Sequence, residues 1–178
     1  MMHTIRVDRV LRETVNTAYS DLVTRATGRA VRSSIRQTIA ALEGGTALLD
    51  FSSVGLVDFS CADEVVAQLL LEKTDDVIVV LGGLREDHTE TIEHVLTHHA
   101  LAVVVQESPD GCPRLLGLVD REAQEVFERL HVHGAADAET MGQHLGWDAE
   151  RAQDALDTLV RLRLVRQEGL TFAPLPLP

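Results

Sequence analysis

Residues 46–73 read TALLDFSSVGLVDFSCADEVVAQLLLEK and form the stretch around which the rest of the chain is organised. The apolar residues 47–49 end at Asp50, which is typical of a buried strand. A loop follows, and from Ser60 onward apolar residues recur at helical spacing, at Ala62, Val65, Val66 and Leu69. We therefore expect a strand that ends at Asp50 and a helix that opens at Ser60.

Ser60 directly precedes this periodic run, and Asp63 follows three residues later, which is the spacing of a capping box. In that motif the hydroxyl accepts a hydrogen bond from a backbone N–H of the first turn, and the carboxylate reaches back. Asp63 and Glu64 also lie where the positive end of the helix dipole favours acids. We expect Ser60 to be the N-cap residue.

The same stretch resembles the STAS family, the fold shared by sulphate-transporter tails and anti-sigma-factor antagonists. In that family a strand ends in Asp or Asn, and a loop then presents Asp-Ser-Ser-Gly at a helix start, where a partner kinase phosphorylates the second Ser. The resemblance places Asp50 at the strand end, Asp58 at the motif Asp and Ser60 at the phosphorylated position. Phe59 stands in place of the first Ser, and Cys61 in place of the Gly.

The run Ser60, Ala62, Asp63, Glu64 looks closer to a divergent STAS-like branch that is often encoded near histidine-kinase-like ATPases. The resemblance covers roughly residues 20–106. It implies a protein partner, such as a histidine-kinase-like ATPase or a sigma-factor system. It also implies a docking or phosphoswitch loop made of Asp58, Ser60, Asp63 and Glu64. Phosphorylation of Ser60 and a purely structural role as an N-cap are both open at this stage.

The length and composition favour one core plus an appendage, because the chain has 178 residues, of which 45% are hydrophobic and 25% charged. No apolar run approaches the length of a membrane span, and the start of the sequence has no long apolar stretch. We expect a cytoplasmic protein that does not bind membranes. Cys61 and Cys112 lack metal-type spacing and are expected to be reduced thiols; Cys61 is either a small buried residue or a reactive thiol.

Charge is distributed unevenly along the chain. Residues 1–44 carry seven arginines against four acids, a net of +3. Residues 45–118 have a net of -10, and residues 119–178 have a net of -5. Only the N-terminal segment could therefore attract a polyanion.

Four arginines, Arg25, Arg29, Arg32 and Arg36, follow one another at spacings of four, three and four, which places them on one helix face. The apolar pattern predicts a helix over 15–43 that Gly28 either kinks or splits, after a first strand within 4–12. This arginine stripe is a candidate docking surface for an acidic surface or a phosphate. The alternative is a solvated face that is partly paired with acids of the same chain.

Apolar β-branched runs at 77–83 and 101–107, separated by a helical pattern over 88–100, indicate an α/β domain with a largely parallel sheet. A short strand at 113–118 completes a STAS-like domain over residues 1–118. Nucleotide-binding glycine motifs do not occur, so we expect no cofactor. His94 and His98 have the spacing of a metal pair, but the sequence positions no third ligand, and we expect no metal site.

Residues 119–178 are predicted to form a second, small domain. A helix over 120–130, a helix capped by Asp137 and a third helix after Asp148 precede a hairpin at Glu168 and Gly169. This order, over residues 119–173, resembles the winged helix-turn-helix of bacterial regulators. The outward residues of the third helix are mostly acidic, which favours contact with protein over DNA. They are Asp148, Glu150, Arg151, Gln153, Asp154 and Asp157.

The sequence thus favours a bacterial regulatory protein that is not an enzyme and acts through protein–protein interaction. The first alternative is a DNA-binding transcription regulator, whose candidate phosphate contacts are Arg161, Arg163 and Arg166. The weaker alternative is an enzyme with an acidic site near Asp50 and Asp58. A homodimer is compatible with each of these functions.

Overall fold

The computed structural model describes residues 1–73 and 76–177 and divides into two compact units, unit 1 (Met1–Leu118) and unit 2 (Val119–Pro176). Pro178, the end of the predicted second domain, lies outside the described residues. Among the described residues, no helix is both long enough and apolar enough to cross a membrane.

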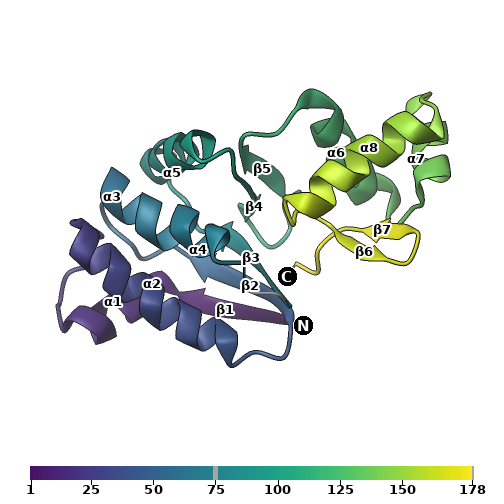
Figure 1. Cartoon of the computed structure of the whole chain (residues 1–178). Coiled ribbons are helices and arrows are strands. Elements are labelled where there is room, and N and C mark those ends of the chain that lie inside the picture. The colour runs from purple at the N-terminus through teal and green to yellow at the C-terminus, as the bar shows by residue number, and fades with distance from the viewer. Residues whose placement is uncertain (74–75, 178) are drawn as a thin grey trace. The chain divides into compact units, whose positions relative to one another are not determined.

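Unit 1 contains a five-stranded sheet with the strand order β1-β2-β3-β4-β5 (Figure 1). The first four strands are parallel, and β5 pairs antiparallel with β4. The expected α/β class with a largely parallel sheet is therefore confirmed. The strands are β1 (Met2–Arg6), β2 (Gly45–Asp50), β3 (Val77–Gly82), β4 (Ala102–Gln106) and β5 (Arg114–Gly117).

The helices of unit 1 are α1 (Val7–Val15), α2 (Arg25–Ala40), α3 (Phe59–Ala62), α4 (Leu69–Leu71) and α5 (Glu86–His98), with a π-helical stretch η1 (Asp63–Gln68). The segments α3, η1 and α4 follow one another without a break and form one helix over residues 59–71. This helix packs between α2 and α5 over one face of the sheet (Figure 1).

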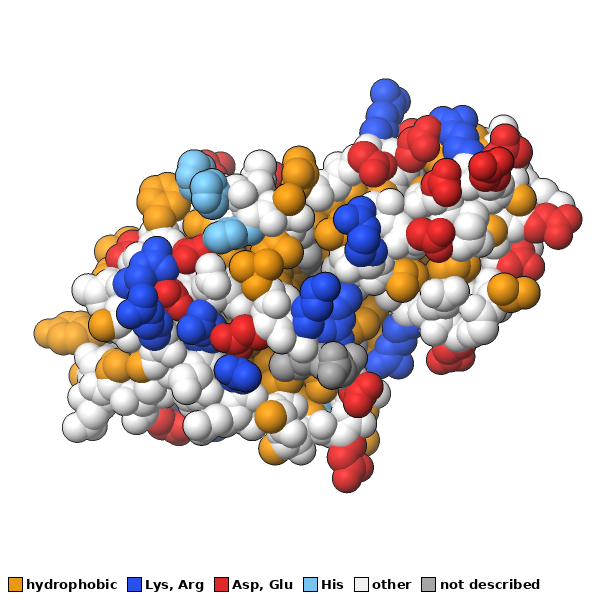
Figure 2. Space-filling model, in the orientation of Figure 1, with side chains coloured by type: hydrophobic (Ala, Val, Ile, Leu, Met, Phe, Trp, Pro, Cys, Tyr) orange, Lys and Arg blue, Asp and Glu red, His pale blue; other side chains and the backbone are white. Residues whose placement is uncertain are grey.

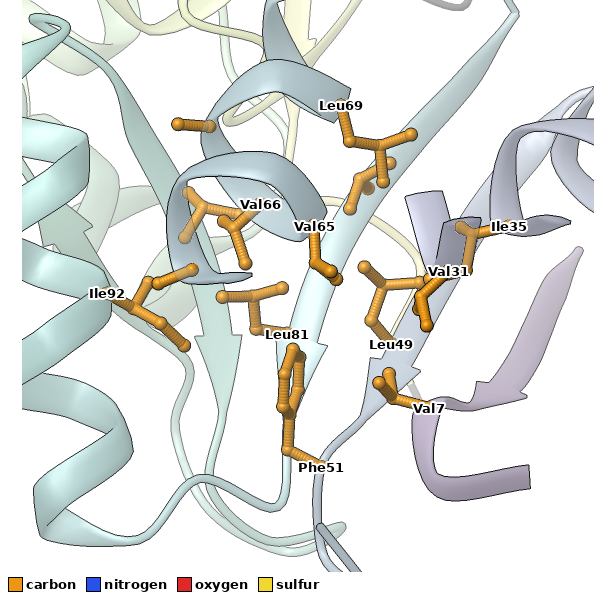
Figure 3. Close-up of a cluster of buried hydrophobic side chains, with 14 of the residues drawn as sticks. Val7, Val31, Ile35, Leu49, Phe51, Val65, Val66, Leu69, Leu81 and Ile92 are labelled. Carbon is orange, nitrogen blue, oxygen red and sulfur yellow. The ribbon is translucent and has the colours of Figure 1, made fainter. Parts of the chain in front are cut away.

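Aliphatic side chains from these three helices and from the strands form the core of unit 1. In Figure 3, Val31 and Ile35 of α2 point toward Leu49 of β2, and Ile92 of α5 lies near Leu81 of β3. All five side chains are fully buried. Burial of each such side chain stabilises the fold by about 1.5–3 kcal/mol, so this layer fixes the positions of the loops at the ends of β2 and β3.

The N-terminal quarter differs from the sequence-based prediction. The first strand ends at Arg6, and helix α1 begins at Val7, so the strand expected within 4–12 is only partly present. Residues 16–24 are not helical, because Asn16 ends α1 in the left-handed conformation. Gly28 neither kinks nor splits α2: a Cβ there would lie 3.0 Å from the Cβ of Glu64, so this glycine allows close helix packing.

Unit 2 contains three helices and an antiparallel strand pair, in the expected order. The helices are α6 (Arg121–His133), α7 (Ala138–Leu145) and α8 (Ala149–Arg161), and the strands are β6 (Arg166–Glu168) and β7 (Thr171–Ala173). Each helix is capped by an aspartate that accepts from a backbone N–H of the first turn: Asp120, Asp137 and Asp148. The buried apolar residues of this unit include Phe127, Leu156 and Phe172.

Candidate functional site

Asp58, and not Ser60, caps the helix over 59–71, so the predicted capping box is wrong. The Oδ1 atom of Asp58 accepts hydrogen bonds from the Cys61 amide (2.8 Å) and from the Ser60 hydroxyl (2.7 Å). Its Oδ2 atom accepts from the Thr24 amide at 2.9 Å. Burial raises the pKa of Asp58, but the hydrogen bonds from Cys61, Thr24 and Ser60 outweigh this effect and hold the pKa below its usual value.

The loop between β2 and Asp58 is bound along one side by residues 20–24. Leu22 donates its amide to the Leu56 carbonyl (2.7 Å) and accepts from the Asp58 amide (3.0 Å). The Gly55 amide donates to the Ser20 carbonyl at 2.8 Å. The two segments therefore form a short parallel bridge, and the loop that leads to Ser60 is held in one conformation.

Arg85 and His88, at the start of α5, bind the same loop from the other side. The Arg85 guanidinium donates to the carbonyls of Val54 (3.2 Å) and Gly55 (3.0 Å). The His88 ring accepts from the Arg85 amide through Nδ1, so Nε2 carries the proton and donates to the Gly55 carbonyl at 2.6 Å. Sequence reasoning missed both residues, since nothing in the local pattern links α5 to this loop.

The arginine stripe on α2 faces acids of the neighbouring helix, which confirms the alternative of pairing within the chain. Arg25 lies 2.7 Å from Asp63 and 2.8 Å from Glu64. The remaining pairs are Arg29 with Glu64, Arg32 with Glu64 and Glu72, and Arg36 with Glu72. Two of the four predicted loop residues, Asp63 and Glu64, thus hold the two helices together.

A hollow of about 540 Å³ lies beside Ser60. The Asp63 carboxylate at its edge accepts from Arg25, and its second oxygen is 2.7 Å from Nε2 of His99. Burial raises the pKa of Asp63, but the hydrogen bonds with Arg25 and His99 outweigh this effect and hold the pKa below its usual value. Figure 2 shows imidazoles beside arginine and acidic side chains on this face. The lining residues are Arg25, Phe59, Ser60, Asp63, His94, Val95, His98 and His99.

Four large apolar side chains on or directly next to the two bridged segments are exposed. Tyr19 is 75% exposed, Val23 41%, Leu56 59% and Phe59 58%. The Phe59 ring also contacts the His94 ring edge-on, with centroids 5.0 Å apart. We call these four residues the apolar surface; they lie on the segments that flank Asp58 and Ser60.

Asp50 and Cys61, which the sequence also singled out, each have a hydrogen-bond partner in unit 1. Asp50 accepts from the Ser52 amide at 2.9 Å and thereby closes the turn after β2. Among the described residues, no group of three or more His, Cys, Asp or Glu side chains could hold a metal ion. Cys61 is buried, and desolvation, together with Asp58, raises the pKa of its thiol to about 12, which favours the small buried residue over the reactive thiol.

In unit 2, the exposed face of α8 is acidic. Asp148, Glu150, Asp154 and Asp157 are exposed. Arg151 lies over the Trp147 ring, 4.1 Å from its centroid, and pairs with Glu122 at 2.6 Å. The candidate phosphate contacts occur at and after the end of this helix, where Arg161 is exposed and Arg163 and Arg166 are half-buried.

No protein-family model matches this chain, and no curated protein matches it.

Proposed function

We propose that this chain is a regulatory protein without catalytic activity, and that unit 1 is a divergent STAS-like domain that binds a protein partner through the loop carrying Ser60. The observation that carries this proposal is the exposure of four large apolar side chains, Tyr19, Val23, Leu56 and Phe59, on or next to two segments that are hydrogen-bonded to each other. Large exposed apolar patches mark protein-binding sites, and these four side chains are the residues we assign to such a patch.

The hydrogen bonds around the loop support a binding role, because they reduce the entropy lost on association. Residues 20–24 hold one side of the loop, and Arg85 and His88 hold the other. A surface that is ordered before its partner arrives binds more tightly than a flexible one with the same contacts. The loop is therefore suited to recognition by a rigid partner.

The partner we propose is a histidine-kinase-like ATPase or a component of a sigma-factor system in the cytoplasm. Such a kinase would transfer a phosphoryl group from a nucleoside triphosphate to Oγ of Ser60, with loss of the hydroxyl proton and release of the nucleoside diphosphate. The phosphate would lie beside the Asp58 carboxylate, which accepts from the Ser60 hydroxyl at 2.7 Å. Repulsion between these charges would change docking.

For unit 2 we propose a winged-helix-like module that provides a second contact with protein. The acidic exposed face of α8 supports protein over DNA, since DNA phosphates repel carboxylates.

Purification of the tagged chain from its host after nuclease treatment tests the docking proposal. We expect a stoichiometric protein that is retained by the wild-type chain and lost with Phe59→Glu. Leu71→Glu is the matched control, since Leu71 is 44% exposed at the opposite end of the same helix. Mass spectrometry of the Ser60 peptide reports phosphorylation. Equal recovery of the partner with both variants would rule out the apolar surface as the docking site.

A further inference from the structure

The backbone of Thr24 is in a conformation that β-branched residues rarely adopt. Its φ is +72° and its ψ is +141°, immediately before the first residue of α2. Such a conformation is strained and persists only where neighbouring contacts impose it. The contacts at Thr24 therefore indicate what this strained conformation depends on.

Three hydrogen bonds hold the Thr24 peptide groups. The Thr24 amide donates to Oδ2 of Asp58 at 2.9 Å, and its carbonyl accepts from the Gly28 amide (3.1 Å) and from Sγ of Cys61 (3.0 Å). Only the bond to Asp58 involves a charged group, and bonds to charged groups are the stronger ones. Asp58 is thus the main external restraint on Thr24.

The carboxylate that restrains Thr24 also accepts the Ser60 hydroxyl. Oδ1 binds Ser60 and the Cys61 amide, while Oδ2 binds Thr24. A negative group at position 60 would remove the hydroxyl donor and repel the carboxylate. Because the two oxygens belong to one planar group, rotation that takes Oδ1 away from position 60 also takes Oδ2 away from the Thr24 amide.

We propose that Asp58 couples the charge at position 60 to the conformation of Thr24 and hence to the apolar surface; this inference rests on the proposed function. Val23, one of the four residues of that surface, directly precedes Thr24 and is 41% exposed. When Asp58 turns away, Thr24 relaxes to a negative φ, and Val23 changes position relative to Leu56 and Phe59. Asp58 is therefore a positioning residue that links modification to surface shape.

Amide hydrogen exchange of the full ¹⁵N-labelled chain, followed by NMR, tests this coupling at Thr24. We expect the protection of the Thr24 amide to fall by about tenfold or more in Ser60→Glu and in Asp58→Asn, whose neutral amide has one acceptor oxygen in place of the two of the carboxylate. Ser60→Ala removes the hydroxyl without adding charge and should retain the protection. Ser33→Glu adds the same charge at an exposed position on α2 and is the matched control.

Unchanged protection of Thr24 in Ser60→Glu would overturn the coupling, as would an equal loss in Ser33→Glu or Ser60→Ala. If Ser60→Glu does not fold, Ser60→Asp decides, since it places the same charge at position 60 on a shorter side chain. The coupling and the proposed function can fail separately. The purification with Phe59→Glu tests partner binding and leaves Asp58 and Ser60 unchanged, whereas the exchange experiment needs no partner.

Discussion

Cys61 lies in the first turn of a helix, where the helix dipole favours a thiolate, yet its side chain is completely buried. Desolvation and the neighbouring Asp58 raise the pKa of the thiol to about 12, so at pH 8 the thiol is protonated as well as shielded from solvent. Cys112, in contrast, is exposed. We expect iodoacetamide at pH 8 to modify the native chain once, at Cys112.

Peptide mass spectrometry identifies the modified cysteine. The same reaction in urea is the control, since both thiols should then be alkylated. Modification of Cys61 in the folded chain at a rate close to that of Cys112 would contradict the buried, protonated state.

At the scale of elements, the contact between α2 and η1 combines one buried carboxylate with several exposed guanidinium groups. The Glu64 side chain is 5% exposed and pairs with Arg25 and Arg29, while Arg32 lies 2.8 Å from its second oxygen. Arg36 is 60% exposed and lies 3.4 Å from Glu72. The two kinds of pair should differ in their effect on stability.

We expect Glu64→Gln to lower the free energy of unfolding by about 2 kcal/mol, because it weakens hydrogen bonds between charged groups at a buried position. Arg36→Gln should cost less than about 1 kcal/mol, since solvent screens an exposed pair. Urea unfolding followed by far-UV circular dichroism measures both values. The slope of the free energy of unfolding against urea concentration should be the same in the wild-type chain and in both variants. Equal losses of unfolding free energy in Glu64→Gln and Arg36→Gln would show that burial of Glu64 does not determine how much its ion pairs stabilise the fold.

The same elements explain which predictions could be made from sequence. Strands β3 and β4 were predictable, because their β-branched runs are bounded by turn residues. The segment around Val7 was not, since Ile5 and Val7 fit strand alternation while Val7, Val10 and Leu11 fit one face of a helix. The N-cap was misassigned because Asp58 and Ser60 are both good caps, and the contact that favours Asp58 comes from Thr24, 34 residues away.

At the scale of the whole molecule, the arginines of residues 1–44 do not form a free basic surface. Four of the seven pair with acids of the neighbouring helix. The chain has a net charge of -12, and its most basic segment is largely neutralised within unit 1. A field of this sign repels polyanions at a distance and favours partners with basic surfaces.

We therefore expect the full chain not to bind duplex DNA at physiological salt. Non-specific DNA binding requires cations that replace the counterions of the phosphates. The exposed face of α8 offers Asp148, Glu150, Asp154 and Asp157, and its Arg151 is already paired with Glu122. Fluorescence anisotropy of a labelled duplex, titrated at about 50 and 150 mM salt, measures this. Binding that weakens with salt and is lost in Arg161→Ala/Arg163→Ala would instead identify unit 2 as a DNA-binding module, because those two arginines would then contact phosphates.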